Sequence, residues 1–264
     1  QQKWRAGPLI GGQPLAGPTQ DITNPANRRQ VVGQVATTSP AQLEDAVSRA
    51  TRAQVSWAQL PVAERAGCLE RAADLRETRQ AELMALCIKE AGKTLADALA
   101  ELREAVDFCR YYAARARLDF AEPQRLPGPT GERDEIALTG RGVFLCISPW
   151  NFPLAIFTGQ VVAALVAGNA VLAKPAEQTP LIAAAAVRLL HQAGVPGDVL
   201  HLLPGDGAAV GGTLVADERI SGVAFTGSVG TAKLINRALA AREGAIVPLI
   251  AETGGQNCMI VDST

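Results

Sequence analysis

Short apolar runs alternate with helical segments over the second half of the chain, and this alternation restricts the fold more than any other feature. The five apolar runs cover 142–148, 170–174, 199–204, 220–226 and 245–252. The helical segments between them cover 154–167, 180–193, 206–216 and 228–242. Neighbouring parallel strands need a crossover connection, which is usually a helix. The sequence therefore predicts an α/β fold with a doubly wound, nucleotide-binding layer over 143–252.

Charged residues are distributed unevenly along the chain. Of the 80 residues from 41 to 120, 25 are Asp, Glu, Lys or Arg, against 8 of the 90 residues from 143 to 232. Solvent-facing helices carry many charges, whereas the strands of a parallel sheet are buried on both faces. We therefore expect helices over 39–121 and a buried sheet after them.

Two helix starts can be placed in the charged part. Ser39-Pro40 and Pro61 mark them, because proline is favoured in the first turn of a helix. Helical spacing predicts that the following residues lie on the buried sides of these helices: Leu43, Ala46, Val47, Ala50 and Val55, then Ala66, Leu69, Ala73 and Leu75. Proline and glycine interrupt the helical pattern over 122–142, which predicts a loop or hairpin, and we expect 1–38 to form an N-terminal arm.

Composition excludes several classes of protein. The formal net charge is −1, from 25 Lys and Arg against 26 Asp and Glu, which argues against a nucleic-acid-binding or membrane-surface protein. The five cysteines form no C-x-x-C pair and only two histidines accompany them, so we expect no metal site and no disulfide framework, and a reducing compartment. No secretory signal is visible. The sequence starts at Gln1 without a methionine and stops at Thr264 soon after a hydrophobic stretch, so we expect both ends to be cut from a longer protein.

In doubly wound sheets, ligands bind beyond the carboxyl ends of the strands, so the residues that follow each apolar run are the candidates for chemistry. One candidate, Gly205 to Gly211, nearly fits a dinucleotide fingerprint, but its spacing is G-x-G-x-x-x-G. The simpler interpretation is a glycine turn that starts a helix.

A second candidate is the turn Ile147 to Pro153, in which two prolines flank Trp150, Asn151 and Phe152. Proline fixes φ and stiffens the turn, so the amide of Asn151 could be held ready to donate to an oxyanion formed from a carbonyl. A rigid turn in which Asn151 is only a local cap explains the pattern equally well.

Three further strand ends carry polar residues. Lys174 and Glu177 could hold two ribose hydroxyls, or could be a solvated surface pair. Gly227 and Ser228 begin a helix whose free N–H groups could hold a pyrophosphate, or could form a bare N-cap. Glu252 precedes a glycine pair, as a movable general base would, or it lies in a simple turn.

Four motifs in this order, PWNFP (149–153), AKPAE (173–177), FTGS (225–228) and ETGG (252–255), resemble the NAD-binding half of the aldehyde dehydrogenase superfamily. The entry Asn24-Pro25-Ala26 and the segment 89–93 (KEAGK) match the family as well, so the resemblance covers essentially the whole sequence. It implies an atypical five-stranded Rossmann layer without the usual glycine fingerprint, preceded by helices over 39–121. A C-terminal catalytic domain would begin at 253–264 and be otherwise missing.

Two segments narrow the resemblance. Residues 103–112, and 252–257 (ETGGQN in place of the commoner ELGGK), resemble Δ1-pyrroline-5-carboxylate dehydrogenases, in particular that domain of the bifunctional proline utilization A proteins of bacteria. The resemblance implies NAD-dependent oxidation of L-glutamate γ-semialdehyde to glutamate in proline catabolism. It also implies an upstream proline dehydrogenase with FAD, of which no residue is present here.

The resemblance assigns a role to individual residues. Asn151 would donate to the oxyanion, and Glu252 would be the general base that activates water. The cofactor-binding residues would be Ile147, Ser148, Pro149, Trp150, Lys174, Glu177, Gly207, Phe225, Thr226, Gly227 and Ser228. Many members have glycine five residues after the position of Gly227, where this chain has Ala232, and a preference between NAD and NADP stays open.

The family's nucleophilic cysteine lies well beyond the general base, whereas this sequence extends only 12 residues past Glu252. Cys258 lies in the apolar run CMIV, and we expect it to be a buried strand residue and not the nucleophile. The piece itself is therefore expected to be inactive while retaining at most cofactor binding.

The resemblance also implies a bacterial cytoplasmic protein whose longer parent is a homo-oligomer, assembled through the 122–142 segment, and is peripheral to the inner membrane. Its partner would be a small aldehyde, with no nucleic acid bound by this part. Two alternatives remain: an aldehyde dehydrogenase of another specificity, such as a succinate semialdehyde or betaine aldehyde enzyme, and a non-catalytic binding or oligomerisation module.

Overall fold

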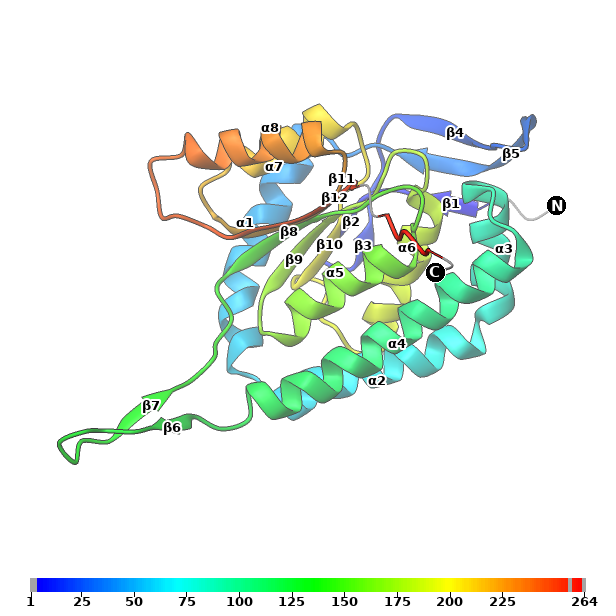
Figure 1. Cartoon of the computed structure of the whole chain (residues 1–264). Coiled ribbons are helices and arrows are strands. Elements are labelled where there is room, and N and C mark those ends of the chain that lie inside the picture. The colour runs from blue at the N-terminus through cyan, green and yellow to red at the C-terminus, as the bar shows by residue number, and fades with distance from the viewer. Residues whose placement is uncertain (1–3, 256–257, 263–264) are drawn as a thin grey trace.

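The computed structural model describes residues 4–255 and 258–262 and shows a central sheet with helices on both faces (Figure 1). The helices are α1 (Pro40–Gln59), α2 (Val62–Thr78), α3 (Gln80–Ala91), α4 (Leu95–Asp119), α5 (Ala155–Val166), α6 (Pro180–Gln192), α7 (Thr213–Ala216) and α8 (Val229–Ala240). Helices α1, α7 and α8 cover one face of the sheet. Helices α5 and α6 cover the other, and α2, α3 and α4 form an outer layer on them. Among the described residues, no helix is both long and apolar enough to cross a membrane.

All five expected strands are present and parallel, which confirms the α/β prediction. They are β8 (Val143–Ile147), β9 (Ala170–Lys174), β10 (Leu200–Leu202), β11 (Ile220–Gly227) and β12 (Leu249–Thr253). Their order in the sheet is β12-β11-β8-β9-β10. The chain runs outward from β8 through β9 to β10 and then crosses back to β11, so the topological switch point lies between β8 and β11.

The N-terminal arm contains strands that the sequence did not reveal. Strands β2 (Leu9–Ile10) and β3 (Gln13–Pro14) extend the sheet beyond β10 in antiparallel pairing, so it has seven strands where five were expected. Strands β1 (Trp4–Ala6), β5 (Asn27–Ala36) and β4 (Thr19–Asn24) form a separate small sheet in that order. Strands β1, β2 and β3 have two or three residues and are too short to show a period, and β2 pairs with a strand about 190 positions away, so periodicity could not predict these three. Strands β4 and β5 are long enough to show a period but were not predicted.

Helix α1 begins where the sequence predicts. The Ser39 hydroxyl accepts from the Gln42 N–H at 3.3 Å, and the Gln42 side chain accepts from the Ser39 N–H at 2.8 Å. This capping box satisfies two backbone donors, and Pro40 occupies the first turn without losing a helical hydrogen bond.

One residue of α1 was placed on the wrong side. Val55 is 57% exposed, whereas Trp57 is buried and donates its indole N–H to the Leu165 carbonyl oxygen at 2.8 Å. From Ala50, helical spacing of three and four residues leads to 54 and 57, so Val55 lies off the buried stripe.

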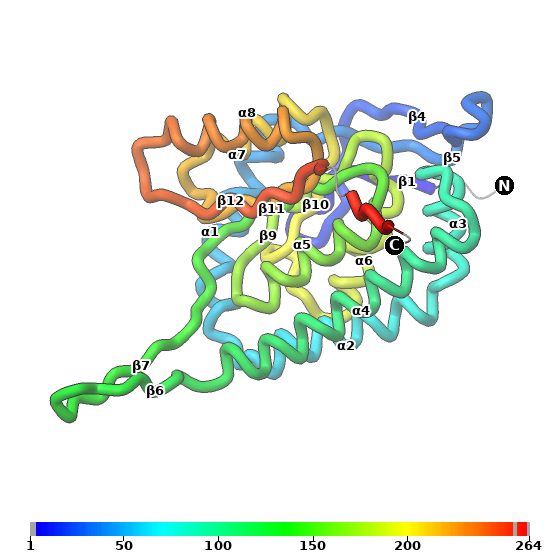
Figure 2. Tube along the Cα trace, in the orientation of Figure 1, coloured from blue at the N-terminus to red at the C-terminus, as the bar shows by residue number. Residues whose placement is uncertain are grey.

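Residues 122–142 contain a two-stranded antiparallel hairpin, β6 (Gln124–Leu126) and β7 (Asp134–Ile136), which projects from the body (Figure 2). Every residue of both strands is exposed. A hairpin of two strands is marginally stable in water without further packing.

His201 fixes the N-terminal strands to the sheet from within β10. Its Nδ1 accepts from the Gly11 N–H at 3.3 Å, and its Nε2 lies 3.1 Å from the Asp198 carbonyl oxygen, where a neutral ring with the proton on Nε2 donates. Burial lowers the pKa of His201 to about 4, and its backbone bond to Asp198 partly opposes this. The ring is therefore neutral in the folded chain at neutral pH.

This predicts a pH-dependent loss of stability. Because the folded-state pKa lies below the unfolded value of 6.5, the stabilisation is complete above pH 6.5 and is lost as the pH falls towards 4. Across that window the loss from His201 is about 3 kcal/mol. Urea unfolding of the wild type and of His201→Gln at several pH values measures it, and the free-energy difference between them should shrink as the pH falls. Parallel curves would show that His201 is not the group that titrates.

Candidate functional site

The carboxyl ends of four parallel strands bring the sequence-predicted residues to one edge of the sheet. Ile147 at the end of β8 pairs with Lys174 on β9 and with Phe225 on β11. On the other side, Thr226 on β11 pairs with Glu252 on β12. Motifs spread over more than 100 residues of sequence therefore meet at the switch point, where open α/β sheets bind ligands.

Lys174, Glu177 and Gly207 form a compact cluster at this edge. The Lys174 ammonium nitrogen lies 3.6 Å from Oε1 of Glu177, and the same oxygen accepts from the Gly207 N–H at 2.7 Å. Lys174 is only 4% exposed, whereas the Glu177 side chain is 44% exposed, so the cation of the pair is removed from water and its carboxylate is not. Burial lowers the pKa of Lys174, and the charge of Glu177 works against that change. A Cβ atom on Gly207 would lie 3.4 Å from the Glu177 oxygen, in space that glycine leaves free beside the two charges.

The glycine-rich turn at 205–211 starts a helix, in agreement with the simpler interpretation. Residues Gly207–Gly212 form a single π-helical segment that leads into α7. The Asp206 carboxylate accepts from the N–H groups of Ala208 and Ala209 at 2.9 and 2.8 Å, and these bonds lower the pKa of Asp206. Those amides are thus occupied, so this turn does not offer the anion site of a standard fingerprint.

The β11–α8 turn has the features of a phosphate site. Ser228 is the N-cap of α8 and accepts from the Thr231 N–H at 3.1 Å. The first-turn N–H groups of Val229 and Gly230 precede the intrahelical bonds and remain as donors at a helix N-terminus, where anions bind. The ring of Phe225 lies against Gly227, where a Cβ atom would approach it to 2.6 Å.

Gln160 belongs to this site although the sequence analysis missed it. From α5, its Nε2 donates to the Thr226 hydroxyl at 2.9 Å, which links the helix to the end of β11. A single amide side chain in a helix without charged residues was the available signal, because an amide that is removed from water needs a partner.

The turn after β8 presents Asn151 at the surface. The Ser148 N–H donates to the Lys174 carbonyl oxygen at 3.2 Å, so the first residue of the turn is held against the end of β9. Ser148 is buried, Pro149 is half-buried, and Trp150 and Asn151 are exposed. The Asn151 amide is therefore available to a ligand beside the sheet edge.

The last strand places Glu252 on the exposed side of the sheet edge. Strand β12 extends through Thr253, so Glu252 lies inside the strand and its backbone is held by pairing with β11. Gly254 and Gly255 follow it, whereas Gln256 and Asn257 of the same motif lie outside the described residues.

Cys258 was expected to be a buried strand residue, and this is wrong. It is exposed and lies outside any strand, as do Met259, Ile260 and Val261 after it. An apolar run is buried only where another element covers it, and in the described part of this chain none packs on these residues.

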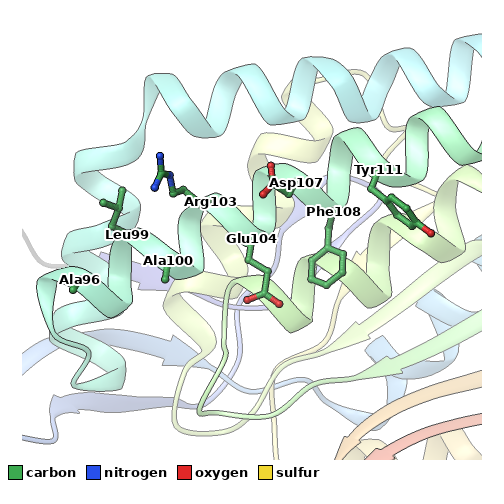
Figure 3. A pocket seen from close by; sticks show the side chains of 8 residues that line it. All are labelled: Ala96, Leu99, Ala100, Arg103, Glu104, Asp107, Phe108 and Tyr111. Atoms are coloured by element: carbon green, nitrogen blue, oxygen red, sulfur yellow. The ribbon is translucent and has the colours of Figure 1, made fainter.

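A shallow hollow of 740 Å³ lies away from the sheet edge, along one face of α4 (Figure 3). All of its lining residues come from that helix, including Leu99, Glu104, Phe108 and Tyr111. It contains none of the sequence-predicted site residues, so the candidate site remains the sheet edge.

The donor set at this edge fits a dinucleotide. A buried ammonium and a carboxylate next to a glycine suit ribose hydroxyls, and the N-terminus of α8 suits a pyrophosphate.

Comparisons with known proteins agree with this fold. The Aldehyde dehydrogenase family matches residues 14–264. The chain is 49% identical over 266 residues to "Bifunctional protein PutA" of Escherichia coli, covering 100% of this chain and 19% of that protein. It is 40% identical over 243 residues to "1-pyrroline-5-carboxylate dehydrogenase 2" of Bacillus subtilis, covering 90% of this chain and 47% of that protein.

Solved structures give the same result. A 1-pyrroline-5-carboxylate dehydrogenase from Thermus with bound NAD superposes with a TM-score of 0.91 at 36% identity, covering 96% of this chain and 50% of that one. A variant of Bradyrhizobium japonicum proline utilization A superposes with a TM-score of 0.81 at 58% identity, covering 83% of this chain and 23% of that one. The chain thus spans half or less of these relatives. The family match spans nearly all of its residues, and the chain belongs to the aldehyde dehydrogenase family.

Proposed function

We propose that this chain is the cofactor-binding part of an NAD-dependent dehydrogenase that oxidises L-glutamate γ-semialdehyde to glutamate in proline catabolism. The observation that carries the proposal is the cluster of Lys174, Glu177 and Gly207 at the carboxyl edge of the sheet, beyond strands β9 and β10. The names of the similar proteins supply the substrate, and the NAD-bound Thermus relative supports the cofactor.

In this proposal the sheet edge holds the dinucleotide from several sides. Lys174 donates to one ribose hydroxyl and Glu177 accepts from the other. The first turn of α8, with Gly227 and Ser228, binds the pyrophosphate, and Thr226 is held in place by Gln160. The remaining cofactor-binding residues line its path: Ile147, Ser148, Pro149, Trp150, Gly207 and Phe225.

Two residues take part in the chemistry. The Asn151 amide donates to the oxygen of the aldehyde as that oxygen gains negative charge during attack by a thiolate. Bound NAD⁺ supplies the hydride acceptor. Glu252 then takes a proton from a water molecule that hydrolyses the thioester, so that aldehyde, water and NAD⁺ give acid, NADH and a proton.

The nucleophile is not among the buried cysteines. Burial raises the pKa of Cys68, Cys87, Cys109 and Cys146, that of Cys146 to about 12, so their thiols stay protonated. Cys258 is exposed, but it lies only six residues after Glu252, whereas the family's nucleophile lies well beyond that base. We propose that a cysteine outside this sequence supplies the thiolate, and that this chain alone binds cofactor without oxidising aldehydes.

Assembly belongs to the same proposal. The exposed hairpin β6–β7 carries Leu126 and Ile136, and Leu138 follows it, all partly exposed to water. Pairing of this hairpin with another subunit would cover these side chains and its strand edges. We propose on this basis that the full-length protein is a homo-oligomer.

Removing the buried ammonium should weaken cofactor binding. Lys174→Met is expected to raise the Kd of the chain for NAD⁺ at least about tenfold, because a charge-assisted hydrogen bond to the ribose is lost. Calorimetric titration measures the Kd. The matched control is Lys89→Met, which removes a cation that lies over the Trp4 ring and outside the cluster of Lys174, Glu177 and Gly207. Equal affinity of Lys174→Met and wild type would contradict the assignment.

Replacing the proposed base should slow one step only. In the full-length protein, Glu252→Gln is expected to leave the first burst of NADH intact and to slow steady-state turnover. The reason is that hydrolysis of the acyl-enzyme then lacks the base that activates water. Stopped-flow absorbance at 340 nm separates the two phases. Glu243→Gln, on an exposed carboxylate after α8, is the control. An unchanged steady-state rate would remove Glu252 from the mechanism.

The oxyanion donor can be tested independently. Asn151→Ala is expected to lower kcat of the full-length protein by about 10²–10³-fold, the usual cost of losing one such donor, while the Kd for NAD⁺ stays constant. Asn236→Ala, on the exposed side of α8, should leave both unchanged. A parallel loss of affinity and rate would mean that Asn151 only shapes the cofactor site.

A further inference from the structure

We propose that Glu90 and Glu101, two buried glutamates of the outer helical layer, are positioning residues that fix the two loops of the site. Each carboxylate binds the N-terminal amides of the helix that follows one loop. The loop with Asn151 ends at α5, and the loop with Glu177 ends at α6. The inference that they affect catalysis rests on the proposed function, whereas the inference that they hold the two loops does not.

Glu101 anchors α5. Its Oε2 accepts from the N–H groups of Leu154 and Ala155 at 3.1 and 2.9 Å. Leu154 is the N-cap residue and its apolar side chain offers no acceptor, and the first helical residues after it are apolar as well. The carboxylate from α4 therefore provides both the cap and the negative charge that a helix N-terminus favours. Glu101 is 1% exposed, so water does not compete for these amides.

Lys93 connects this anchor to the turn that carries Asn151. Its ammonium lies 3.2 Å from Oε1 of Glu101, which balances the buried charge. The same ammonium lies 4.1 Å from the centroid of the Phe152 ring, the residue next to Asn151. The turn is thus held at Phe152 and, two residues later, at Leu154.

Glu90 anchors α6 in the same manner. Its two oxygens accept from the N–H groups of Leu181 and Ile182 at 2.7 and 2.8 Å. Pro180 occupies the first position of α6 without an N–H, so these are the first amides that α6 offers. Glu90 is buried and reaches them from the end of α3, more than 90 residues earlier in the sequence.

The two anchors act on different parts of the site. Between β8 and α5 lies the turn with Asn151, which meets the reacting carbonyl in the proposed function. Between β9 and α6 lies the turn with Glu177, which meets the cofactor. Loss of the Glu101 anchor should therefore reduce the rate, and loss of the Glu90 anchor should reduce cofactor affinity.

Amide hydrogen exchange tests the anchors without any reaction. In Glu101→Gln, the NH₂ group must face either the two α5 amides or the Lys93 ammonium, and neither can donate to it. Exchange in a peptide covering 149–157 should therefore rise about tenfold while a peptide covering 177–184 stays unchanged. Glu90→Gln should raise exchange in the 177–184 peptide and leave the 149–157 peptide unchanged. The NH₂ group that replaces one oxygen of Glu90 cannot accept a hydrogen bond from the α6 amide that it faces. Glu77→Gln, which changes the same charge on the exposed side of α2, should move neither peptide. Lys93→Met keeps both anchor carboxylates and should raise exchange in 149–157 by a smaller factor.

Kinetics of the full-length protein then tests the assignment to catalysis. Glu101→Gln should lower kcat at least about tenfold with the Kd for NAD⁺ unchanged, and Glu90→Gln should raise that Kd with kcat at saturation unchanged. Faster exchange in both peptides in either variant, or in neither peptide in both, would overturn the anchoring. If amide exchange changes as expected but Glu101→Gln does not lower kcat alone and Glu90→Gln does not raise the Kd alone, the positioning role is overturned. A wild-type protein that binds no NAD⁺ would overturn the proposed function while the exchange data still decide the anchors.

Discussion

Parallel pairing of five strands is the constraint on which the site depends. It sets the carboxyl ends of β8, β9, β11 and β12 along one edge, and it fixes which side chains face each other there. In this register Ile147 lies between Lys174 and Phe225. Side chains alternate along a strand, so a slip of one residue would turn Lys174 to the opposite face of the sheet. The register therefore determines both the core of the sheet and the position of the buried Lys174 ammonium.

Burial of that ammonium has a cost that the surroundings only partly offset. Desolvation lowers the pKa of Lys174, and the carboxylates of Glu177 and Asp206 act in the other direction. Asp206 is already bonded to two backbone amides, and Glu177 to the amide of Gly207. Each carboxylate thus accepts from backbone amides of a turn and also stabilises the charge of Lys174. A ligand hydroxyl that accepts from Lys174 would restore the solvation that folding removes, which is a physical reason for a polar ligand to bind at this place.

How much could be predicted depended on the range of the interactions. The apolar run 170–174 has the same bounds as strand β9. A parallel strand that is buried on both faces has a continuous apolar sequence, and the residues that end it are next to it in the sequence. The two-residue strand β2 could not be predicted, since it exists only through pairing with β10. In the site, residues that follow strands were found from position alone. Gln160 was not, because its contact with Thr226 spans 66 residues and its helix shows no polar face.

The contacts of the two anchoring glutamates also join residues far apart in the sequence, so they could not be predicted, and the fold gives a physical reason for these contacts. The charge-rich stretch from 41 to 120 predicts solvent-facing helices, and most of its charges are exposed, but Glu90 and Glu101 point inward. Helices α5 and α6 lie between the sheet and the outer layer, so their first turns must be apolar to fit. Apolar first turns cannot cap themselves, and the positive ends of the two helices still require an acceptor. Only a side chain from the outer layer can supply it. Burial raises the pKa of Glu90, and the amides of Leu181 and Ile182 oppose that rise by favouring the ionised form. Helix ends that are buried beside a site therefore depend on acceptor groups that the sequence places in a different layer.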